Sequence, residues 1–463
     1  MQFINKIKLF LKIVFQDNKI ILFIIIFFLV FYSTYLAKNL KTGIIPDEKT
    51  HILISFHFSK TLGIPPNSED IIRLGSIVEQ KPYLFYWVNG RVINLIHIIS
   101  PYSNDFQVLF LLRILNVIYS TGIVIFTYLT SKELIHNKWW QLLPTFLLTN
   151  TLMFVFLSSG VNYDNLANFF SVAGLYFLVR VFHGKDFYQN SLLWMISICL
   201  GTLVKMPILP LVLSMAIVWV YFVLRNRKKI PRINLAGKLN YILFVILLLL
   251  VIGNIKIYGV NLYRYGALEP KCEQVLSKSL CELSPFHTRL QELGLDHKMT
   301  MIESIQLGYP QPISYFFDSW INHIMIRTYG ILGHLVYYPH LIIIFYRLLF
   351  FWIFVMAIKY WKKPSFSIIS ILGISLFYVF VVFVTNYNSE LTFGFKQIAI
   401  QGRYIFPVIG LFYVLVAYTL SKITNPKIKL ITLAYTLILF ILGGPIKFIH
   451  PSYIDIFSDW FIK

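Results

Sequence analysis

The chain has 463 residues, of which 57% are hydrophobic and 13% are charged, and its formal net charge is +21. A soluble protein carries about 25% charged residues, so the composition excludes an ordinary soluble domain and indicates a polytopic membrane protein. The basic residues recur in short groups between apolar runs, whereas a nucleic-acid binder gathers them on one face or in one domain. Three cysteines without a CxxC pair argue against a structural zinc site.

About eleven apolar segments are long enough to cross a bilayer as helices. The first, 20–37, follows a basic stretch and lacks a small-residue cleavage site, so we interpret it as an uncleaved span. The sequence therefore predicts an all-α membrane protein with one transmembrane domain, 1–463. The other spans are expected at 108–131, 140–157, 165–182, 190–206, 208–224, 237–258, 338–358, 366–385, 403–421 and 430–448.

Lysine and arginine set the expected orientation, because short cytoplasmic loops are enriched in both. With the N-terminus inside, every cytoplasmic loop is basic, and the C-terminus and two long loops, 38–107 and 259–335, lie outside. The basic residues of the cytoplasmic loops are Lys132, Lys138, Lys185, Arg225, Arg227, Lys228, Lys229, Arg232, Lys359, Lys362, Lys363, Lys422, Lys427 and Lys429.

The apolar segment 83–99 is interpreted differently from the spans. It contains Asn89, Arg91, Asn94 and His97, and each of these side chains is costly at the bilayer centre. Counting it as a span would also move the basic loops to the outer side. We therefore predict an amphipathic helix that lies in the outer interface.

Polar residues are expected to gather at the outer face, at the ends of several spans. Ionisable residues at membrane depth are rare and usually functional. Five short motifs supply these residues: Asp47, Glu48 and His51 in "PDEKTH"; Arg113 near the start of the second span; Asn162 and Asp164 in "GVNYDN"; Lys205 in "LVKMP"; and Gln401, Arg403 and Tyr404 in "QGRYIFP".

Each of these residues also has an ordinary explanation. Lys205 and Arg113 could snorkel to the interface, Asp164 could cap a helix, and Arg403 could anchor a lipid headgroup. Their common placement at one face favours a polar site instead. A carboxylate there can act as a general base, and arginine or lysine can hold a phosphate as it departs. With a sugar donor, the sugar would pass through an oxocarbenium-like state.

At these residues the chain resembles the GT-C superfamily of integral-membrane glycosyltransferases, which includes the protein O-mannosyltransferases and the lipid A aminoarabinose transferase. The resemblance covers about 20–421 and implies a GT-C-like fold whose long outer loops carry interfacial helices. The motifs "PDE..H", "VN.DN" and "QGRY.FP" are most similar to a branch of bacterial membrane proteins. The residues that carry the resemblance are Asp47–Glu48, the segment "KPYLFYW" at 81–87, Arg113–Ile114, Asp164, and Lys205 in "VK".

The resemblance implies a glycosyltransferase at the outer face of the bacterial cytoplasmic membrane. It would move a hexosyl or pentosyl group, with inversion, from a polyprenyl-phosphate donor to a cell-envelope glycan, lipid or protein. Asp47 is implied as the base, and Glu48 as its support or as a ligand of the acceptor or a metal. Substrate binding is implied for His51, Arg113, Asn162, Asp164, Lys205, Gln401, Arg403 and Tyr404. No cofactor is certain, although Asp47, Glu48, His51 and Asp164 could bind a divalent metal.

Two alternatives and one pairing remain open at this point. A transporter or flippase for a lipid-linked precursor would carry repeats and ionisable groups near the midplane, whereas here these groups lie at the rim. A non-catalytic scaffold leaves the acidic and "QGRY" motifs unexplained. The second long loop, 259–335, is expected to cover the site, and its Cys272 and Cys281 are either a disulfide or two free thiols.

Overall fold

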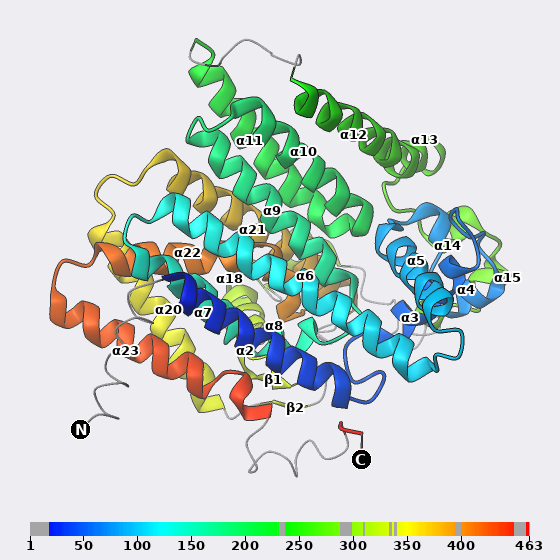
Figure 1. The fold of residues 1–463 in the computed structure, drawn as a ribbon, viewed down its shortest axis with the longest axis horizontal. Helices are drawn as coiled ribbons and strands as arrows, with labels where there is room; N and C mark the ends of the chain where they lie inside the picture. The colour runs from blue at the N-terminus through cyan, green and yellow to red at the C-terminus, as the bar shows by residue number, and fades with distance from the viewer. Residues whose placement is uncertain are drawn as a thin grey trace.

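The computed structural model describes residues 18–228, 230, 237–287, 299–308, 311–332, 336–337, 340–393, 400–448 and 460–462. The chain forms a bundle of long apolar helices with a group of shorter helices at one end (Figure 1). Within the described ranges, ten helices are long and apolar enough to cross a membrane, and a bent helix pair makes eleven when it is counted as one span. The predicted all-α polytopic architecture is confirmed.

The membrane helices follow the predicted order, and η3 (Ile255–Gly259) and α13 (Val260–Tyr265) extend one of them. Lys229 and Arg232, which contribute to the predicted orientation, lie outside the described residues. The long helices are α2 (Asn18–Asn39), α6 (Asp105–Leu134), α9 (Tyr163–Phe182), α10 (Phe187–Val204), α11 (Leu209–Asn226), α12 (Lys238–Asn254), α20 (His340–Tyr360), α21 (Phe366–Phe393), α22 (Phe406–Lys422) and α23 (Pro426–Leu442).

The span expected at 140–157 is broken into α7 (Lys138–Thr149) and α8 (Leu152–Ser158), which meet at 68°. The break falls at Asn150 and Thr151. Asn150 Nδ2 donates to the Phe146 carbonyl at 2.9 Å, and Thr151 Oγ1 donates to the Leu147 carbonyl at 2.9 Å. Side chains of this kind compete with the backbone for the helical hydrogen bonds, which explains the interruption.

The two long loops supply the shorter elements. Helices α3, α4, α5, α14 and α15 gather at the end of the bundle where α2 ends and α6 begins, on the right in Figure 1. The first loop holds α3 (Glu48–Ser59), α4 (Glu69–Arg73), η1 (Val78–Gln80) and α5 (Leu84–Ile99). The second holds α14 (Cys272–Val275), α15 (Lys278–Cys281), α17 (Met301–Leu307), α18 (Pro312–Ser314), η4 (Tyr315–Trp320), α19 (Ile321–Met325), η5 (Ile326–Gly330), and the antiparallel pair β1 (Ile331–Leu332) and β2 (Val336–Tyr337).

Helix α5, the predicted interfacial helix, packs on α3 and does not count among the membrane helices. Its polar residues bond the C-terminal end of α3, where helix carbonyls need partners. Arg91 donates to the Phe58 and Thr61 carbonyls, and Asn94 Nδ2 donates to the Ser59 carbonyl at 3.0 Å. The polar residues of 83–99 therefore join two helices of the first long loop.

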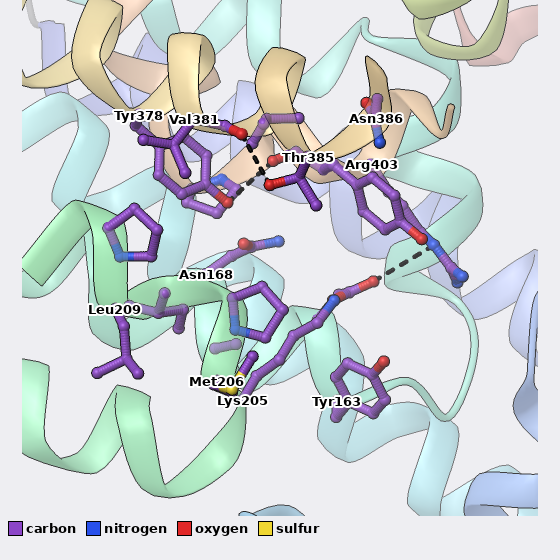
Figure 2. Close-up of a pocket in the computed structure, with 18 of the residues that line it drawn as sticks. Tyr163, Asn168, Lys205, Met206, Leu209, Tyr378, Val381, Thr385, Asn386 and Arg403 are labelled. Carbon is purple, nitrogen blue, oxygen red and sulfur yellow. Dashed lines mark hydrogen bonds and ion pairs between the residues drawn. The ribbon is translucent and has the colours of Figure 1, made fainter. Parts of the chain in front are cut away.

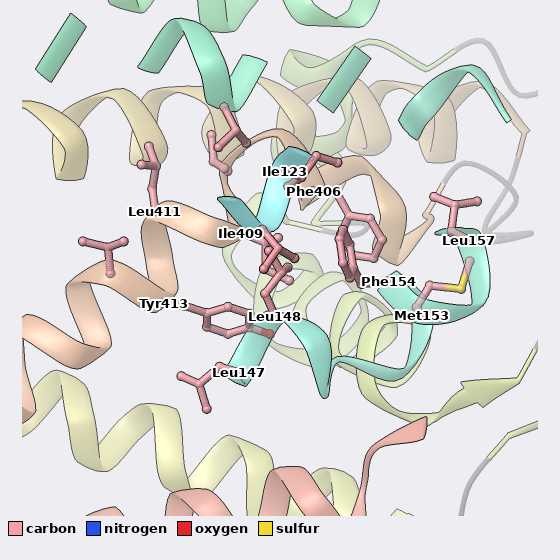
Figure 3. Close-up of a cluster of buried hydrophobic side chains, with 14 of the residues drawn as sticks. Ile123, Leu147, Leu148, Met153, Phe154, Leu157, Phe406, Ile409, Leu411 and Tyr413 are labelled. Atoms are coloured by element: carbon pink, nitrogen blue, oxygen red, sulfur yellow. The ribbon is translucent and has the colours of Figure 1, made fainter. Parts of the chain in front are cut away.

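The core surrounds α22, the most buried of the membrane helices. Figure 3 shows Phe406, Ile409 and Tyr413 of α22 among Leu147 of α7 and Phe154 of α8. Tyr413 also binds polar partners, since its hydroxyl lies 2.6 Å from Thr151 Oγ1 and 2.9 Å from the Tyr329 hydroxyl. This packing fixes the start of α22. The short helix η6 (Gly402–Ile405) comes directly before that start.

Residues 460–462 return to the C-terminal end of α2. Leu40 and Phe461 form an isolated antiparallel bridge, and the Ile462 amide donates to the Asn39 carbonyl at 2.7 Å. This segment therefore lies on the same side of the bundle as the first long loop, as the count of crossings predicts.

Candidate functional site

Asp47 stands at the turn that joins α2 to α3, and its backbone is unusual. Its φ is 61° and its ψ is 5°, a left-handed conformation that non-glycine residues rarely adopt. Such strain costs on the order of 1–3 kcal/mol and recurs at active sites. The carboxylate is 51% exposed, and Arg403 Nη2 donates to its Oδ2 at 2.6 Å. The turn thus presents a half-exposed carboxylate to the start of η6.

Arg403 joins Asp47 to a second acidic residue, Asp164. The Arg403 guanidinium is 8% exposed, and its Nε lies 3.5 Å from Asp164 Oδ2. The Lys205 ammonium forms an ion pair with Asp164 Oδ1. Two cations and two carboxylates from four distant segments therefore form one network. Arg403 Nη1 is enclosed and has no hydrogen-bond partner among the described residues.

Local sequence explains where the two cations lie. Helix α10 ends before Lys205 because Pro207 cannot continue a helix, and Lys205 itself is extended. Arg403 is placed by Gly402, where a Cβ atom would collide with the Arg327 carbonyl of η5. The Tyr378 hydroxyl of α21 donates to the Tyr404 carbonyl at 3.1 Å and holds η6 from the other side.

Two tyrosines enclose the Lys205 ammonium. Its nitrogen lies 4.5 Å from the Tyr163 ring centre and 5.4 Å from the Tyr404 ring centre. Both distances are within the range of cation–π attraction, which strengthens when the cation is desolvated. The lysine is therefore held in one position instead of snorkelling to solvent.

A cavity of about 670 Å³ opens beside this network, between α9, α11, α21 and η6 (Figure 2). In this view Lys205 and Tyr163 lie below the cavity, and Tyr378, Thr385 and Arg403 lie above it. Apolar side chains that include Leu209, Val381 and Val382 line much of the rest. A volume of this order accommodates a small-molecule ligand, and the combination suits a molecule with an anionic group and an apolar part.

Glu48 lies next to Asp47 in sequence but in a different environment. Its side chain and that of Arg113 are fully buried, and the two form a bidentate pair with distances of 2.8 Å from Nε to Oε1 and 2.7 Å from Nη2 to Oε2. The Val161 amide also donates to Glu48 Oε1 at 3.1 Å. Arg113 donates its remaining bonds to the carbonyls of Ala37, Leu40 and Lys41. This pair joins α2, α3, α6 and the turn before α9.

Asn162 connects the two acidic turns. Its Nδ2 donates to the Pro46 carbonyl at 3.0 Å, and its Oδ1 accepts from the Asp164 amide at 2.8 Å. The side chain is fully buried. Asn116 Oδ1 accepts from the Asn162 amide at 3.3 Å and from Asn165 Nδ2 at 3.1 Å. The Asn162 side chain therefore links the turn before Asp47 to the start of α9 at Asp164.

His51 is buried at the back of the site. Its ring lies 4.4 Å from the Tyr163 ring, and its Nδ1 is 3.0 Å from the Tyr86 hydroxyl. Burial lowers the pKa of His51 to about 3, despite the nearby Asp47 and Asp164 carboxylates that raise it. The imidazole is therefore neutral at physiological pH and supports the tyrosine that contacts Lys205.

Gln401 and Tyr404 complete the predicted set. Tyr404 lines the cavity, whereas Gln401 lies outside its lining in the part of the chain described, and its carbonyl accepts from the Tyr404 amide at 3.1 Å. Across the same described ranges, no three His, Cys, Asp or Glu side chains converge as a metal site. The Asp47 and Asp164 carboxylates both face cations instead.

Comparison with known families decides the chain's membership. A family model described as dolichyl-phosphate-mannose-protein mannosyltransferase matches residues 20–259. The chain belongs to this family. The membership confirms the predicted relation to the membrane glycosyltransferases that include the protein O-mannosyltransferases. The part of the chain that the family model matches contains Asp47, Asp164 and Lys205, whereas Arg403 lies beyond it.

Two solved structures are similar to this chain. ArnT from Cupriavidus metallidurans, bound to undecaprenyl phosphate, has 12% identity and a TM-score of 0.48, with 90% of this chain and 62% of that one covered. An oligosaccharyltransferase from Archaeoglobus fulgidus, in complex with zinc and sulfate, has 14% identity and a TM-score of 0.49, with 94% and 55% covered. The chain thus spans less than two thirds of the length of these proteins. No curated protein sequence matches it.

Several residues that line the cavity of this family member were not predicted from the sequence. Glu269 comes from the second long loop, and Thr385, Asn386 and Ser389 come from α21. The polar residues of α21 could have been found, because they lie at and just beyond the end of the span expected at 366–385. Glu269 gave no signal, since its loop has no recognisable pattern. Cys272 and Cys281 of the same loop form a disulfide, which settles that pairing.

Proposed function

We propose that this member of the mannosyltransferase family transfers a sugar from a polyprenyl-phosphate donor to an acceptor at the membrane surface. The observation that carries the proposal is the network of Asp47, Asp164, Lys205 and Arg403 beside one cavity with an apolar wall. A transporter would instead carry its ionisable groups near the midplane. The undecaprenyl phosphate bound by ArnT is consistent with a donor of this class.

Arg403 and Lys205 are proposed to hold the donor phosphate. Arg403 Nη1, enclosed and without a described partner, could donate to a phosphate oxygen, and the planar guanidinium suits that group. Lys205 adds a fixed positive charge. The isoprenoid part of the donor would lie along the apolar side of the cavity, beside Leu209 and Val382.

Asp47 is proposed as the general base. It would take the proton of an acceptor hydroxyl while that oxygen forms a bond to the anomeric carbon. The bond from the anomeric carbon to the phosphate oxygen breaks, and the phosphate leaves with the electron pair, stabilised by the two cations. A single displacement of this kind inverts the anomeric centre. The sugar would be a hexose or pentose and the acceptor an envelope glycan, lipid or protein, on the outer face of a bacterial cytoplasmic membrane.

Glu48 and Arg113 receive a different role from the one that the sequence suggested. Both side chains are fully buried and bonded to each other and to backbone groups. We propose that they position the Asp47 turn and contact neither substrate nor metal. Asn162 and His51 are likewise proposed as positioning residues, whereas Asp164 orients Lys205 and Arg403. A metal is not needed for this mechanism, and addition or chelation of divalent ions in the assay tests that point.

The decisive experiment replaces Asp47 with asparagine and measures transfer from a polyprenyl-phosphate sugar. Loss of a general base typically lowers the rate by about 10²- to 10⁴-fold. Asp70→Asn is the matched control, because Asp70 lies on α4 of the same loop and is exposed. The proposal predicts that only Asp47→Asn loses activity and that both variants melt like the wild type. Wild-type transfer by Asp47→Asn would contradict the assigned base.

A further inference from the structure

A second cluster of basic residues lies behind η6, on α19, η5 and α20. His323 of α19 and Arg327 of η5 are four residues apart on consecutive helical segments, so they lie near one face. Helix α20, which carries Arg347, packs against both segments. Tyr329 of η5 stacks on Tyr346 of α20 with ring centres 4.3 Å apart, and this contact holds the two helices in register.

The three basic residues have unmet hydrogen-bonding capacity. His323 Nδ1, Arg327 Nε and Arg347 Nε are all buried and have no partner within the described part of the chain. Arg327 Nη1 donates one hydrogen bond to the Ile400 carbonyl. No carboxylate in the described ranges lies within ion-pair distance of either arginine. Among the described residues the cluster therefore has no counter-ion.

Such an arrangement is costly unless an anion is present. A buried donor without a partner costs about 1–3 kcal/mol, and two arginines that face one region repel each other. Arg347 also lies within an apolar membrane helix, where ionisable residues are rare and usually functional. Burial lowers the pKa of His323, and the charges of Arg327 and Arg347 lower it further. The imidazole is therefore uncharged at neutral pH and can still donate one hydrogen bond.

The surroundings indicate what carries the anion. On α20, Ile344, Leu348 and Phe351 flank Arg347 and are 46%, 54% and 66% exposed, as expected for a surface that faces lipid. Arg347 lies about 10 Å along the helix from its start at His340, so its long side chain can reach the interface. A ligand that enters from this surface needs an apolar part to lie in the lipid and an anionic group to reach both arginines. A lipid with a phosphate headgroup has both. Arginine binds phosphate through its planar fork.

We propose that His323, Arg327 and Arg347 form a second phosphate site, which takes the headgroup phosphate of an anionic lipid. The site is separate from the cavity beside Lys205, because none of the three residues lines that cavity. Its location has a consequence for the catalytic network. Arg327 binds the Ile400 carbonyl, and its own carbonyl packs against Gly402. A lipid on Arg327 would therefore steady the segment that presents Arg403.

Lipid binding can be measured without any transfer assay. Delipidated protein is titrated with phosphatidylglycerol or phosphatidylcholine, and bound lipids are counted by native mass spectrometry. We expect one phosphatidylglycerol to bind in preference to phosphatidylcholine. Arg347→Gln should weaken that binding by at least about tenfold, because it removes a charged hydrogen bond, and Arg347→Lys should retain part of it. Arg264→Gln is the control, since Arg264 is an exposed cation on α13.

Two further arms keep the test decisive. His323→Gln replaces a residue outside the apolar span, so it tests the site even if Arg347→Gln fails to fold, and it should also weaken binding. Inorganic phosphate at millimolar concentration distinguishes the two sources of the anion. If phosphate alone displaces the lipid, the site takes soluble phosphate as well. Equal phosphatidylglycerol binding by the wild type and both variants, or no preference over phosphatidylcholine, would overturn the proposal.

Discussion

The buried pair of Glu48 and Arg113 allows a prediction that separates stability from catalysis. Glu48→Gln keeps the size of the side chain but removes its charge. The new amide nitrogen would face donors whichever way it is turned, because Glu48 accepts from Arg113 on both oxygens and from the Val161 amide on one. Arg113 would remain fully buried. Its contacts would then be carbonyl oxygens alone, without a compensating charge.

The size of the effect follows from this geometry. Removing one partner of a buried ion pair costs about 3–5 kcal/mol, because the other charge stays in a medium that cannot solvate it. Unfolding entropy is about 2.1 cal/mol/K per residue. In a chain of 463 residues the loss then corresponds to a melting temperature roughly 3–5 °C lower. Asp47→Asn, the same chemical change one residue away, should shift it by less than about 1 °C, since that carboxylate is 51% exposed.

The assay is thermal melting in detergent, followed by transfer kinetics on the protein that remains folded. We expect Glu48→Gln to melt earlier and to keep much more activity than Asp47→Asn. The double variant Glu48→Gln with Arg113→Met should recover part of the lost stability, because it removes the isolated charge. Equal melting of both single variants would refute this reasoning. So would an activity loss for Glu48→Gln as deep as that of Asp47→Asn at unchanged stability.

Three other predictions test the remaining parts of the site. Arg403→Ala should lower kcat/KM for the donor by at least about 10²-fold. Arg403→Lys should recover only part of the lost activity, because a point charge replaces a planar fork. Full activity of the alanine variant would contradict the assignment. Asn162→Asp should lower kcat about 10- to 100-fold. The new carboxylate still accepts from the Asp164 amide, but it puts an acceptor where Asn162 Nδ2 donates to the Pro46 carbonyl. Unchanged kinetics would show that the asparagine does not position the turn. His51 has a folded pKa of about 3 against about 6.5 when unfolded, so the unfolded chain binds the extra proton and stability falls as the pH drops below about 6.5. His51→Asn should therefore lose less melting temperature than the wild type between pH 7.5 and 5, and parallel losses would count against this explanation.

The sequence by itself determined the membrane architecture, because hydropathy and loop charge are local properties. Each span needs only a long apolar run, and the polar residues of 83–99 were enough to keep that segment out of the bilayer. Four residues of the sequence motifs, Asp164, Lys205, Arg403 and Tyr404, line the cavity, and the sequence indicated them because polar residues at the end of an apolar helix are visible without a fold.

The tertiary structure decided the surroundings of each of these residues. Asp47 and Glu48 are adjacent and chemically alike, but the left-handed turn at Asp47 directs one carboxylate to Arg403 and the other to Arg113. Pattern cannot distinguish them, because the burial of each depends on a residue that lies 65 or more positions away. The broken span at Asn150 and the cluster around Arg347 were missed for the same reason. Long-range packing sets the partners of a polar group, and those partners determine whether it supports the fold or remains available to bind.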